Sequence, residues 1–386
     1  MIGGAQVSGL TIYGTTGSFD AFGVVTLSIS DTNEGTFDVQ ASAIVDFNGY
    51  WSVPVNIAGL VDGPILVNAR LEDPSDNVAS TSVRFVKDAN TFVFITFPDA
   101  NAVINSVTAS GLVVAGTGEA GGSVFVTVMD GDSSTVNVVS STVPVDGNGR
   151  WTVTTSIAGL RDGVIRVMAT IRDAAGNTRD SSTVTISKDA SLTISVLNPT
   201  SYQYVISQAR ASSVTISGFA DTGSAVSVVV SDMNGETANV RTIPVTVSPL
   251  GTWSLTANVL SLADGDLSFD VTARDTASNV VQLQSIILKK DTQISPATAI
   301  LAPVAGSNVS RSLLVSGTGE PLARVSLRIS GSSGVISRTV PVSAGGSWTT
   351  TVGISTLPLG AISIGGTTTD SAGNTAPISV VNVIKA

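Results

Sequence analysis

Apolar and polar residues alternate along short runs of this chain. In residues 165–172 the apolar set is Ile165, Val167, Ala169 and Ile171, and the same register recurs over residues 65–71 and 267–273. A period of two residues is that of a half-buried strand. Clusters of Gly, Asp, Asn and Pro separate the runs at spacings of about 8–12 residues. About seven short strands in about 100 residues predict an antiparallel β-sandwich.

Three motifs recur at fixed spacing. Each Trp follows a Gly by two positions, and successive Trp residues are 100, 102 and 95 positions apart: Trp51, Trp151, Trp253 and Trp348. Eleven residues after each Trp comes a turn, at Asp62-Gly63, Asp162-Gly163, Asp264-Gly265 and the degenerate Leu359-Gly360. A second turn begins eleven residues later, at Asp73, Asp173, Asp275 and Asp370, and ends in Asn. This spacing indicates four repeats of one fold.

The repeat ends are marked by lysine. All five Lys residues lie there, at Lys87, Lys188, Lys289, Lys290 and Lys385, and three of them precede an Asp. We therefore predict four domains, at residues 1–88, 89–189, 190–291 and 292–386. The junctions contain no Gly/Ser-rich tract, so short linkers and an elongated rod are expected.

The first repeat lacks a leading strand. The other three open with an apolar strand that runs to Pro98, Pro199 or Pro303, whereas Met1 lies only about a dozen residues before Gly14. Gly14 matches Gly116 of the second repeat. We expect either an open sheet edge or a strand supplied to this repeat by another chain.

The recurring residues have a structural interpretation. Each Trp is expected to open a strand and fill the core at one end of its sandwich, contributing a few kcal/mol by burial. In the Asp-x-x-Gly-Asn turn, as at Asp173–Asn177, Gly is expected to adopt positive φ and Asp to cap backbone N–H groups. The Asp62, Asp162 and Asp264 turns are expected to carry the chain across the end of the sandwich.

Together these motifs resemble the bacterial Ig-like repeats of adhesins and biofilm proteins, and also the Ig-like modules of tailed-phage virion proteins. The residues that carry the resemblance are Leu-x-Asp-Gly, the alternating strand after it, and Asp-x-Ala-Gly-Asn. It covers essentially the whole chain. It implies an all-β fold of four tandem Ig-like antiparallel β-sandwiches, and it implies no catalytic residues.

Composition excludes several classes of function. The 386 residues include no Cys and no His, which removes thiol nucleophiles, Ser-His-Asp triads and His metal ligands. The formal net charge is −10, with 19 basic residues and no basic cluster, so nucleic-acid binding is not expected. Paired carboxylates occur only as repeated turn residues. We therefore predict that the protein is not an enzyme.

Calcium is the cofactor that the resemblance suggests, since such repeats often bind it at junctions. The candidate ligands are Asp88, Asp189 and Asp291, with the Asp73, Asp173, Asp275 and Asp370 turns close to a domain end. Calcium prefers six to eight oxygen ligands, and each junction offers a single Asp in sequence. Asp130-Gly-Asp132 and Asp146-Gly-Asn148 are the nearest approaches to a cluster. The expectation is therefore capped turns and solvated carboxylates, with no bound cofactor.

Two sets of residues are candidate contacts. Residues 292–386 carry five basic and two acidic residues, unlike the acidic first repeat. This asymmetry suggests that the last repeat docks on an acidic surface through Arg311, Arg324, Arg328 and Arg338. Tyr202 and Tyr204 lie in an insertion of the third repeat and are candidate exposed contacts. Surface drift and edge decoration are the respective alternatives.

Two functions fit these features. The favoured one is a non-catalytic virion accessory protein, a phage capsid decoration or fibre protein on the virion surface. It fits a chain with Met1, no secretion signal and no apolar run of membrane-spanning length. The alternative is a stalk segment of a bacterial cell-surface adhesin or biofilm protein. The expected partners are protein subunits at a particle or cell surface and a host-surface ligand, without membrane insertion.

Overall fold

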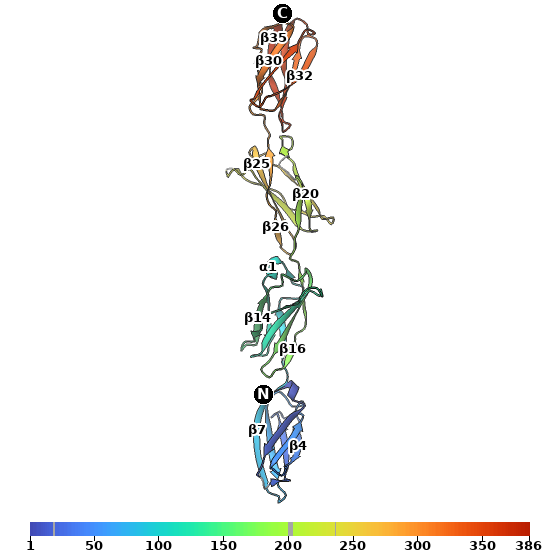
Figure 1. Ribbon diagram of the computed structural model, residues 1–386, viewed down its shortest axis with the longest axis vertical. Coiled ribbons are helices and arrows are strands. Elements are labelled where there is room, and N and C mark those ends of the chain that lie inside the picture. Colours follow the sequence, from blue (N-terminus) through green and yellow to red (C-terminus); the bar gives the residue numbers. More distant parts are fainter. Residues whose placement is uncertain (18–19, 200–203, 236) are drawn as a thin grey trace. The chain divides into compact units, whose positions relative to one another are not determined.

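The computed structural model describes residues 1–17, 20–199, 204–235 and 237–386. It is almost entirely β, and the chain forms two compact units, residues 1–191 and 192–386. Each unit contains two of the sequence repeats. The predicted all-β class with antiparallel sandwiches is confirmed, and in the described residues every repeat has its own pair of sheets (Figure 1). The predicted bounds of the four domains stay a prediction.

The first unit contains the first two sandwiches. The elements of the first are β1 (Ile2–Gly3), η1 (Gly4–Gln6), β2 (Leu10–Thr15), β3 (Val24–Ser30), β4 (Val39–Ile44), β5 (Tyr50–Val55), β6 (Gly63–Glu72) and β7 (Val78–Asp88). Those of the second are β8 (Val93–Phe97), β9 (Val103–Ile104), α1 (Ser106–Ala109), β10 (Leu112–Gly118), β11 (Ser123–Met129), β12 (Val138–Val139), β13 (Val143–Pro144), β14 (Arg150–Thr155), β15 (Gly163–Arg172), β16 (Thr178–Asp180) and β17 (Val184–Lys188).

The second unit contains the other two. The third sandwich has β18 (Ile194–Asn198), β19 (Val205–Ile206), β20 (Val214–Ala220), β21 (Ala225–Ser231), β22 (Val240–Arg241), β23 (Val245–Thr246), β24 (Thr252–Ala257), β25 (Gly265–Arg274), β26 (Val280–Gln282) and β27 (Ile286–Lys290). The fourth has β28 (Ala299–Ala302), β29 (Asn308–Val309), β30 (Ser312–Thr318), β31 (Arg324–Ser330), β32 (Val335–Pro341), β33 (Ser347–Gly353), β34 (Gly360–Thr369) and β35 (Thr375–Lys385).

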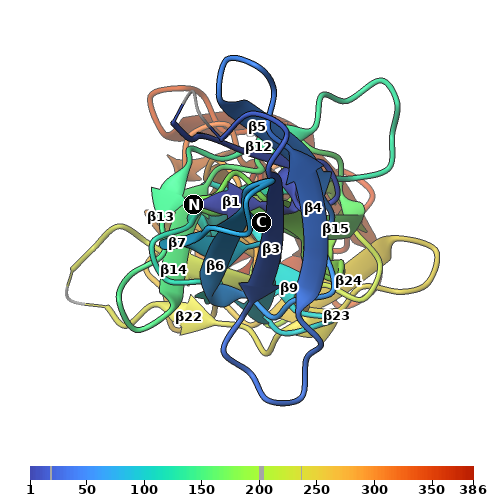
Figure 2. The same ribbon diagram turned by 90° about the horizontal axis from the view of Figure 1, so that it is seen from below.

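The sheet order is the same from repeat to repeat. The larger sheet runs β1-β7-β6-β3-β4 in the first sandwich, and Figure 2 shows β7, β6, β3 and β4 side by side. Its short first strand is parallel to its neighbour, and the other pairs are antiparallel. The smaller sheet is β14-β10-β8 in the second sandwich, and its counterparts in the third and fourth also have three strands. In the first sandwich, the smaller sheet consists of β2 and β5 alone among the described residues.

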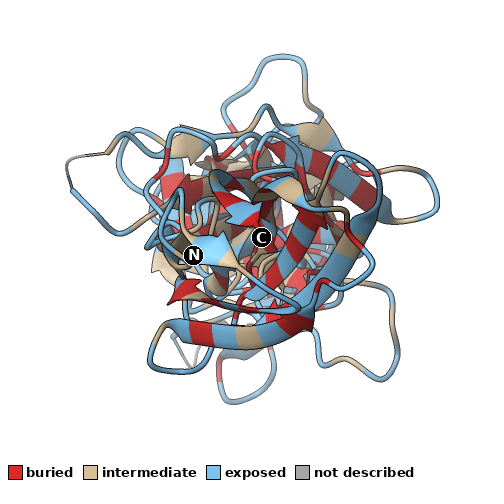
Figure 3. Ribbon diagram, turned by 90° about the horizontal axis from the view of Figure 1, so that it is seen from above, coloured by how far each residue is buried: buried red, intermediate tan, exposed pale blue. Residues whose placement is uncertain are grey.

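The alternation of apolar and polar residues places one face of each strand in a core. Buried and exposed residues succeed one another along the strands (Figure 3). On β15 the inward residues are those of the predicted apolar set, and Ile165, Val167, Ala169 and Ile171 are all fully buried. Each repeat has a separate buried cluster of this kind. Burial of aliphatic side chains from both sheets therefore stabilises each sandwich separately.

The predicted backbone conformation of the second turn is confirmed. Gly176 and Gly373 have φ of 91° and 89° at the fourth turn position. Asp76 and Ser278 adopt positive φ at the same position of the other two repeats, at 64° and 73°. The turn geometry is therefore kept even where no glycine supplies it.

Candidate functional site

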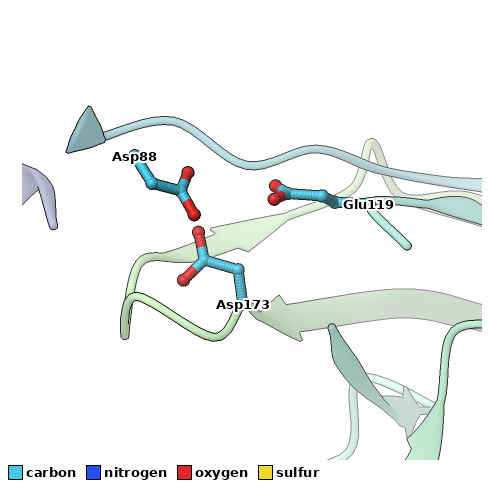
Figure 4. Close-up of side chains that lie close together, drawn as sticks. All are labelled: Asp88, Glu119 and Asp173. Carbon is cyan, nitrogen blue, oxygen red and sulfur yellow. The ribbon is translucent and has the colours of Figure 1, made fainter. Parts of the chain in front are cut away.

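Three carboxylates meet at the junction of the first two repeats. Asp88 is the last residue of β7, Glu119 follows β10, and Asp173 follows β15. One oxygen of each lies within 4.8 Å of an oxygen of the others, and the three side chains point toward one another (Figure 4). Asp173 is buried and the other two are partly buried. The fold therefore assembles a cluster from residues far apart in the sequence.

The second unit contains the same arrangement. Asp291 follows β27, Glu320 follows β30 and Asp370 follows β34, and their carboxylate oxygens meet within the same 4.8 Å. Each of the three occupies the repeat position of its counterpart in the first unit. A cluster that recurs residue for residue is a property of the repeat and its junction.

An asparagine side chain forms hydrogen bonds across each of these two junctions. Asn177 Nδ2 donates to Asp173 Oδ2 at 2.6 Å and to the Asp88 carbonyl at 2.7 Å, while its Oδ1 accepts from Gly4 N at 2.6 Å. In the second unit, Asn374 makes the corresponding bonds to Asp370, the Asp291 carbonyl and Gln208 N. One side chain thus holds the carboxylate cluster and links it to the preceding repeat.

Two carboxyl groups of each cluster have a raised pKa. Burial raises the pKa of Asp88, and the Asp173 and Asp62 carboxylates raise it further. Burial also raises the pKa of Glu119, with added repulsion from Asp88 and Asp173. The same causes raise the pKa of Asp291 and Glu320 in the second unit. Each cluster concentrates negative charge that a cation would neutralise.

The donor set suits a hard divalent cation. It consists of carboxylate oxygens from three chain segments, without nitrogen or sulfur, which is the chemistry preferred by Ca²⁺ and Mg²⁺. Each oxygen of Asp173 accepts one hydrogen bond from Asn177 and keeps further lone pairs. The cluster therefore fits calcium. At these two junctions the structure gathers three carboxylates, where the sequence predicts separate, solvated side chains.

The other calcium candidates are placed elsewhere. Asp189 belongs to neither cluster. In the third repeat the position of Glu119 is taken by Asp221, whose carboxylate accepts hydrogen bonds from Thr193 N and Oγ1. Asp132 forms an ion pair with Arg161 Nε at 2.8 Å. Asp146 caps its own turn by accepting from the N–H groups of Asn148 and Arg150.

The first-turn aspartates pair with buried lysines. Lys87, Lys188 and Lys290 are 3–5% exposed, and their Nζ atoms lie 2.6, 2.7 and 2.8 Å from Asp62, Asp162 and Asp264. Burial by itself would raise the pKa of Asp162. Hydrogen bonds from Lys188, Ser191 and Ala190 N outweigh burial and lower this pKa to about 2. In three of the repeats, the ion pair thus connects the first turn to the lysine at the end of the repeat.

The fourth repeat lacks this carboxylate because Leu359 replaces the Asp. Lys385 is still 8% exposed, and its Nζ donates to the main-chain carbonyls of Ile354, Ser355 and Leu357. Three carbonyl dipoles therefore solvate the charge that an aspartate balances in the other repeats.

The second-turn aspartates act as predicted on the backbone. Asp73 Oδ1 accepts from Ser75 N and Asn77 N, both at 2.8 Å. Asp173, Asp275 and Asp370 accept from the corresponding Asn N–H groups.

Three of the four Trp side chains, Trp151, Trp253 and Trp348, are 3–4% exposed, whereas Trp51 is only partly buried.

The proposed basic docking residues do not share one face. Arg324 and Arg328 lie on the exposed face of β31. Arg338 of β32 pairs with the inward-facing Leu327, so its side chain leaves the opposite face of the sheet. Arg311 precedes β30, where its carbonyl accepts from Ile354 N. A docking surface built from all four is not supported by this register.

Of the two tyrosine candidates, the structure describes Tyr204 alone. Tyr202 lies outside the described residues. Tyr204 is partly buried against the core of the third repeat, and Arg210 lies 5.3 Å from its ring centre. The expectation of an exposed contact at Tyr204 is wrong, because this ring is used for packing.

One segment of the chain, within the second repeat, matches the model of a known protein family. Residues 101–190 match the family model of the bacterial Ig-like domain, which confirms the predicted resemblance over that segment. None of the curated proteins matches the chain. Within the described residues, helices long and apolar enough to span a membrane are absent.

Solved structures of tandem repeats are also similar. A tetra-tandem repeat from the extending region of a large adhesion protein is 26% identical, with a TM-score of 0.45, over 99% of this chain and 96% of the other. A structure described as a bacterial ice-binding adhesin is 22% identical, with a TM-score of 0.32, over 77% of this chain and 96% of the other.

Proposed function

We propose that this chain is a non-catalytic spacer segment of a bacterial cell-surface adhesin, whose repeat junctions are stiffened by calcium. The recurrent three-carboxylate cluster at the junctions carries this proposal. The family match is to a bacterial domain, which favours the adhesin stalk over the virion accessory protein. The role is to hold a binding surface at a distance and to transmit force to it.

The position of the cluster supports a role in stiffening. Asp88 belongs to the first repeat, whereas Glu119 and Asp173 belong to the second. A cation bound by all three would link the two sandwiches, and its charge would offset the burial and the repulsion that raise the pKa of Asp88. Stiffness at the junction would then depend on the calcium concentration outside the cell.

Spin labels at the junction test the proposal. The chain contains no Cys, so Ser52→Cys and Thr152→Cys introduce labels at the same exposed position of the first two repeats. We expect millimolar calcium to narrow the distance distribution measured by double electron–electron resonance, and a chelator to broaden it again. Asp88→Asn should abolish the narrowing, because it removes one of the three carboxylates.

The control is Glu34→Gln, which removes an exposed carboxylate of the first repeat outside the cluster. It should leave the calcium response intact. A distribution that calcium does not alter, or an equal response in Asp88→Asn, would contradict calcium stiffening.

A further inference from the structure

A buried hydroxyl faces the carboxylate cluster of the first junction. Thr91 is 5% exposed, and its Oγ1 has no hydrogen-bond partner of normal geometry among the described residues. Burial raises the pKa of Glu119, and the Thr91 hydroxyl lies close enough to this carboxyl group to oppose the rise. A buried hydroxyl without a partner destabilises a fold, and a cation bound in the cluster would give this one a partner.

Thr91 belongs to the segment that joins the first two sandwiches. Strand β7 ends at Asp88 and β8 begins at Val93, so residues 89–92 form the whole connection. Asp88, at the start of this connection, points toward Glu119 and Asp173 (Figure 4). A cation held by the cluster and by Thr91 would therefore fix the connecting segment itself, in addition to linking the two sandwiches.

The hydroxyl has the chemistry of a calcium ligand. Its oxygen carries two lone pairs, so it can coordinate a cation and keep its proton for a neighbouring carboxylate. Calcium takes six to eight oxygen ligands and accepts neutral oxygens together with carboxylates. Asn177 donates hydrogen bonds to both oxygens of Asp173, which limits how fully this carboxylate can bind a cation. A fourth side chain would therefore add to the coordination.

The second cluster has a different surrounding. Its connecting segment, residues 291–298, is longer, and Ser295 N donates to Glu320 Oε2 at 2.8 Å. Thr298 is also buried and its Oγ1 has no partner in the described residues, but this hydroxyl lies where a Cβ on Gly319 would come within 2.7 Å of it. The main influences on the pKa of Glu320 are burial, Ser295 N and nearby charges. The hydroxyl that faces the first cluster thus has no equivalent in these contacts.

A lysine also distinguishes the second junction. Lys289 lies on β27, two positions before Asp291. Burial raises the pKa of Asp291 and Glu320, whereas the positive charge of Lys289 lowers it. The first unit has Val86 at the position of Lys289. A cation at the second junction would therefore be repelled by a charge that valine does not carry.

We propose that Thr91 is a calcium ligand of the first junction, and that this junction binds calcium more tightly than the junction of the third and fourth repeats. The inference rests on the proposed function, since it assigns a further ligand and an order of filling to the same sites. As the calcium concentration rises, the connection at residues 89–92 stiffens first. The chain then passes through a state in which one junction is stiff and the other still bends.

Isothermal titration calorimetry of the full chain with calcium separates the two sites. Asp291→Asn leaves the first site and Asp88→Asn leaves the second, and we expect the first site to have a dissociation constant about tenfold lower. In the Asp291→Asn background, Thr91→Val should raise the dissociation constant about tenfold, because it removes the hydroxyl and keeps the shape. Thr91→Ser keeps the hydroxyl and should bind calcium as tightly as its parent.

Two controls separate coordination from packing. Thr298→Val removes the other buried hydroxyl, and in the Asp88→Asn background it should leave the dissociation constant unchanged. In the presence of a chelator, Thr91→Val should not lower the melting temperature, since an unpaired buried hydroxyl does not stabilise the fold.

Equal dissociation constants for the two single-site variants, or an unchanged constant in Thr91→Val, would overturn the inference. If neither these variants nor the wild type binds calcium, the proposed function itself fails, and the inference fails with it.

Discussion

Asp162→Asn should lower the free energy of unfolding of the second repeat by about 3–5 kcal/mol, because it leaves the buried Lys188 ammonium without its carboxylate. Chemical denaturation of the full chain at pH 7 measures this loss. The exposed Asp99→Asn is the matched control and should change stability by less than about 0.5 kcal/mol. A loss equal to that of the control would show that the Lys188 carbonyl contact with Leu160 suffices.

The same ion pair has a defined pH dependence. The pKa of Asp162 is lowered from 3.8 to about 2 in the folded protein. Ionisation of Asp162 therefore contributes about 2 kcal/mol to the free energy of unfolding. This contribution is complete above pH 3.8 and is lost as the pH falls toward 2. The difference in stability between the wild type and Asp162→Asn should accordingly shrink below pH 3.8. A constant difference down to pH 2 would contradict the lowered pKa.

Gly116→Ala should destabilise the second repeat by about 3 kcal/mol, because the new methyl group must displace packed atoms. A Cβ at this position would lie 1.9 Å from the Phe94 carbonyl oxygen and 2.5 Å from the Trp151 ring. Neither neighbour can move without loss, since the carbonyl belongs to a paired strand and the indole is buried. Denaturation and a red shift of tryptophan emission would report the change.

Gly159→Ala is the control for this substitution. A Cβ there would meet no described atom within 4 Å, and the backbone is not in the left-handed region. Its effect on stability should stay within about 0.5 kcal/mol. Similar losses of stability in both variants would mean that the close packing of β8 against β10 does not require a glycine at position 116.

The fold was largely predictable because its signals are local. Alternation over residues 165–172 gives β15, and the spacing from Trp151 to Asp162 and Asp173 gives the turns around it. Side-chain periodicity and turn chemistry depend on neighbouring residues, so they are visible in one sequence. The resemblance to bacterial Ig-like repeats rested on the same motifs, and the family match confirms it for residues 101–190.

The site was predicted only in part because its residues come from separate strands. Asp88 and Asp291 were expected at the junctions, but Glu119 and Glu320 carry no local pattern and were missed. Their recurrence at one repeat position, three residues after Gly116 and Gly317, was the available signal. Asn177 was interpreted as a turn residue alone, although it also bonds to the preceding repeat. The buried Lys–Asp pairs cannot be predicted locally, because the two partners are 25 or 26 residues apart and a lysine at a repeat end also suits a domain boundary.

Thermal unfolding with and without calcium is the most direct test of the central claim that the junction carboxylates bind this cation. Without divalent cations, Asp88→Asn and Asp291→Asn should each raise the melting temperature, because the folded state raises the pKa of both carboxyls and their ionised forms destabilise it. With calcium the order should reverse. The wild type should gain several degrees, and the double variant should gain nothing.

Magnesium at the same concentration distinguishes cation binding from general screening, since its small octahedral shell fits a three-carboxylate cluster less well. We expect calcium to raise the melting temperature of the wild type more than magnesium does, and we expect this gain to depend on Asp88 and Asp291. Equal melting temperatures for the wild type with and without calcium, under conditions where the double variant is more stable, would contradict it.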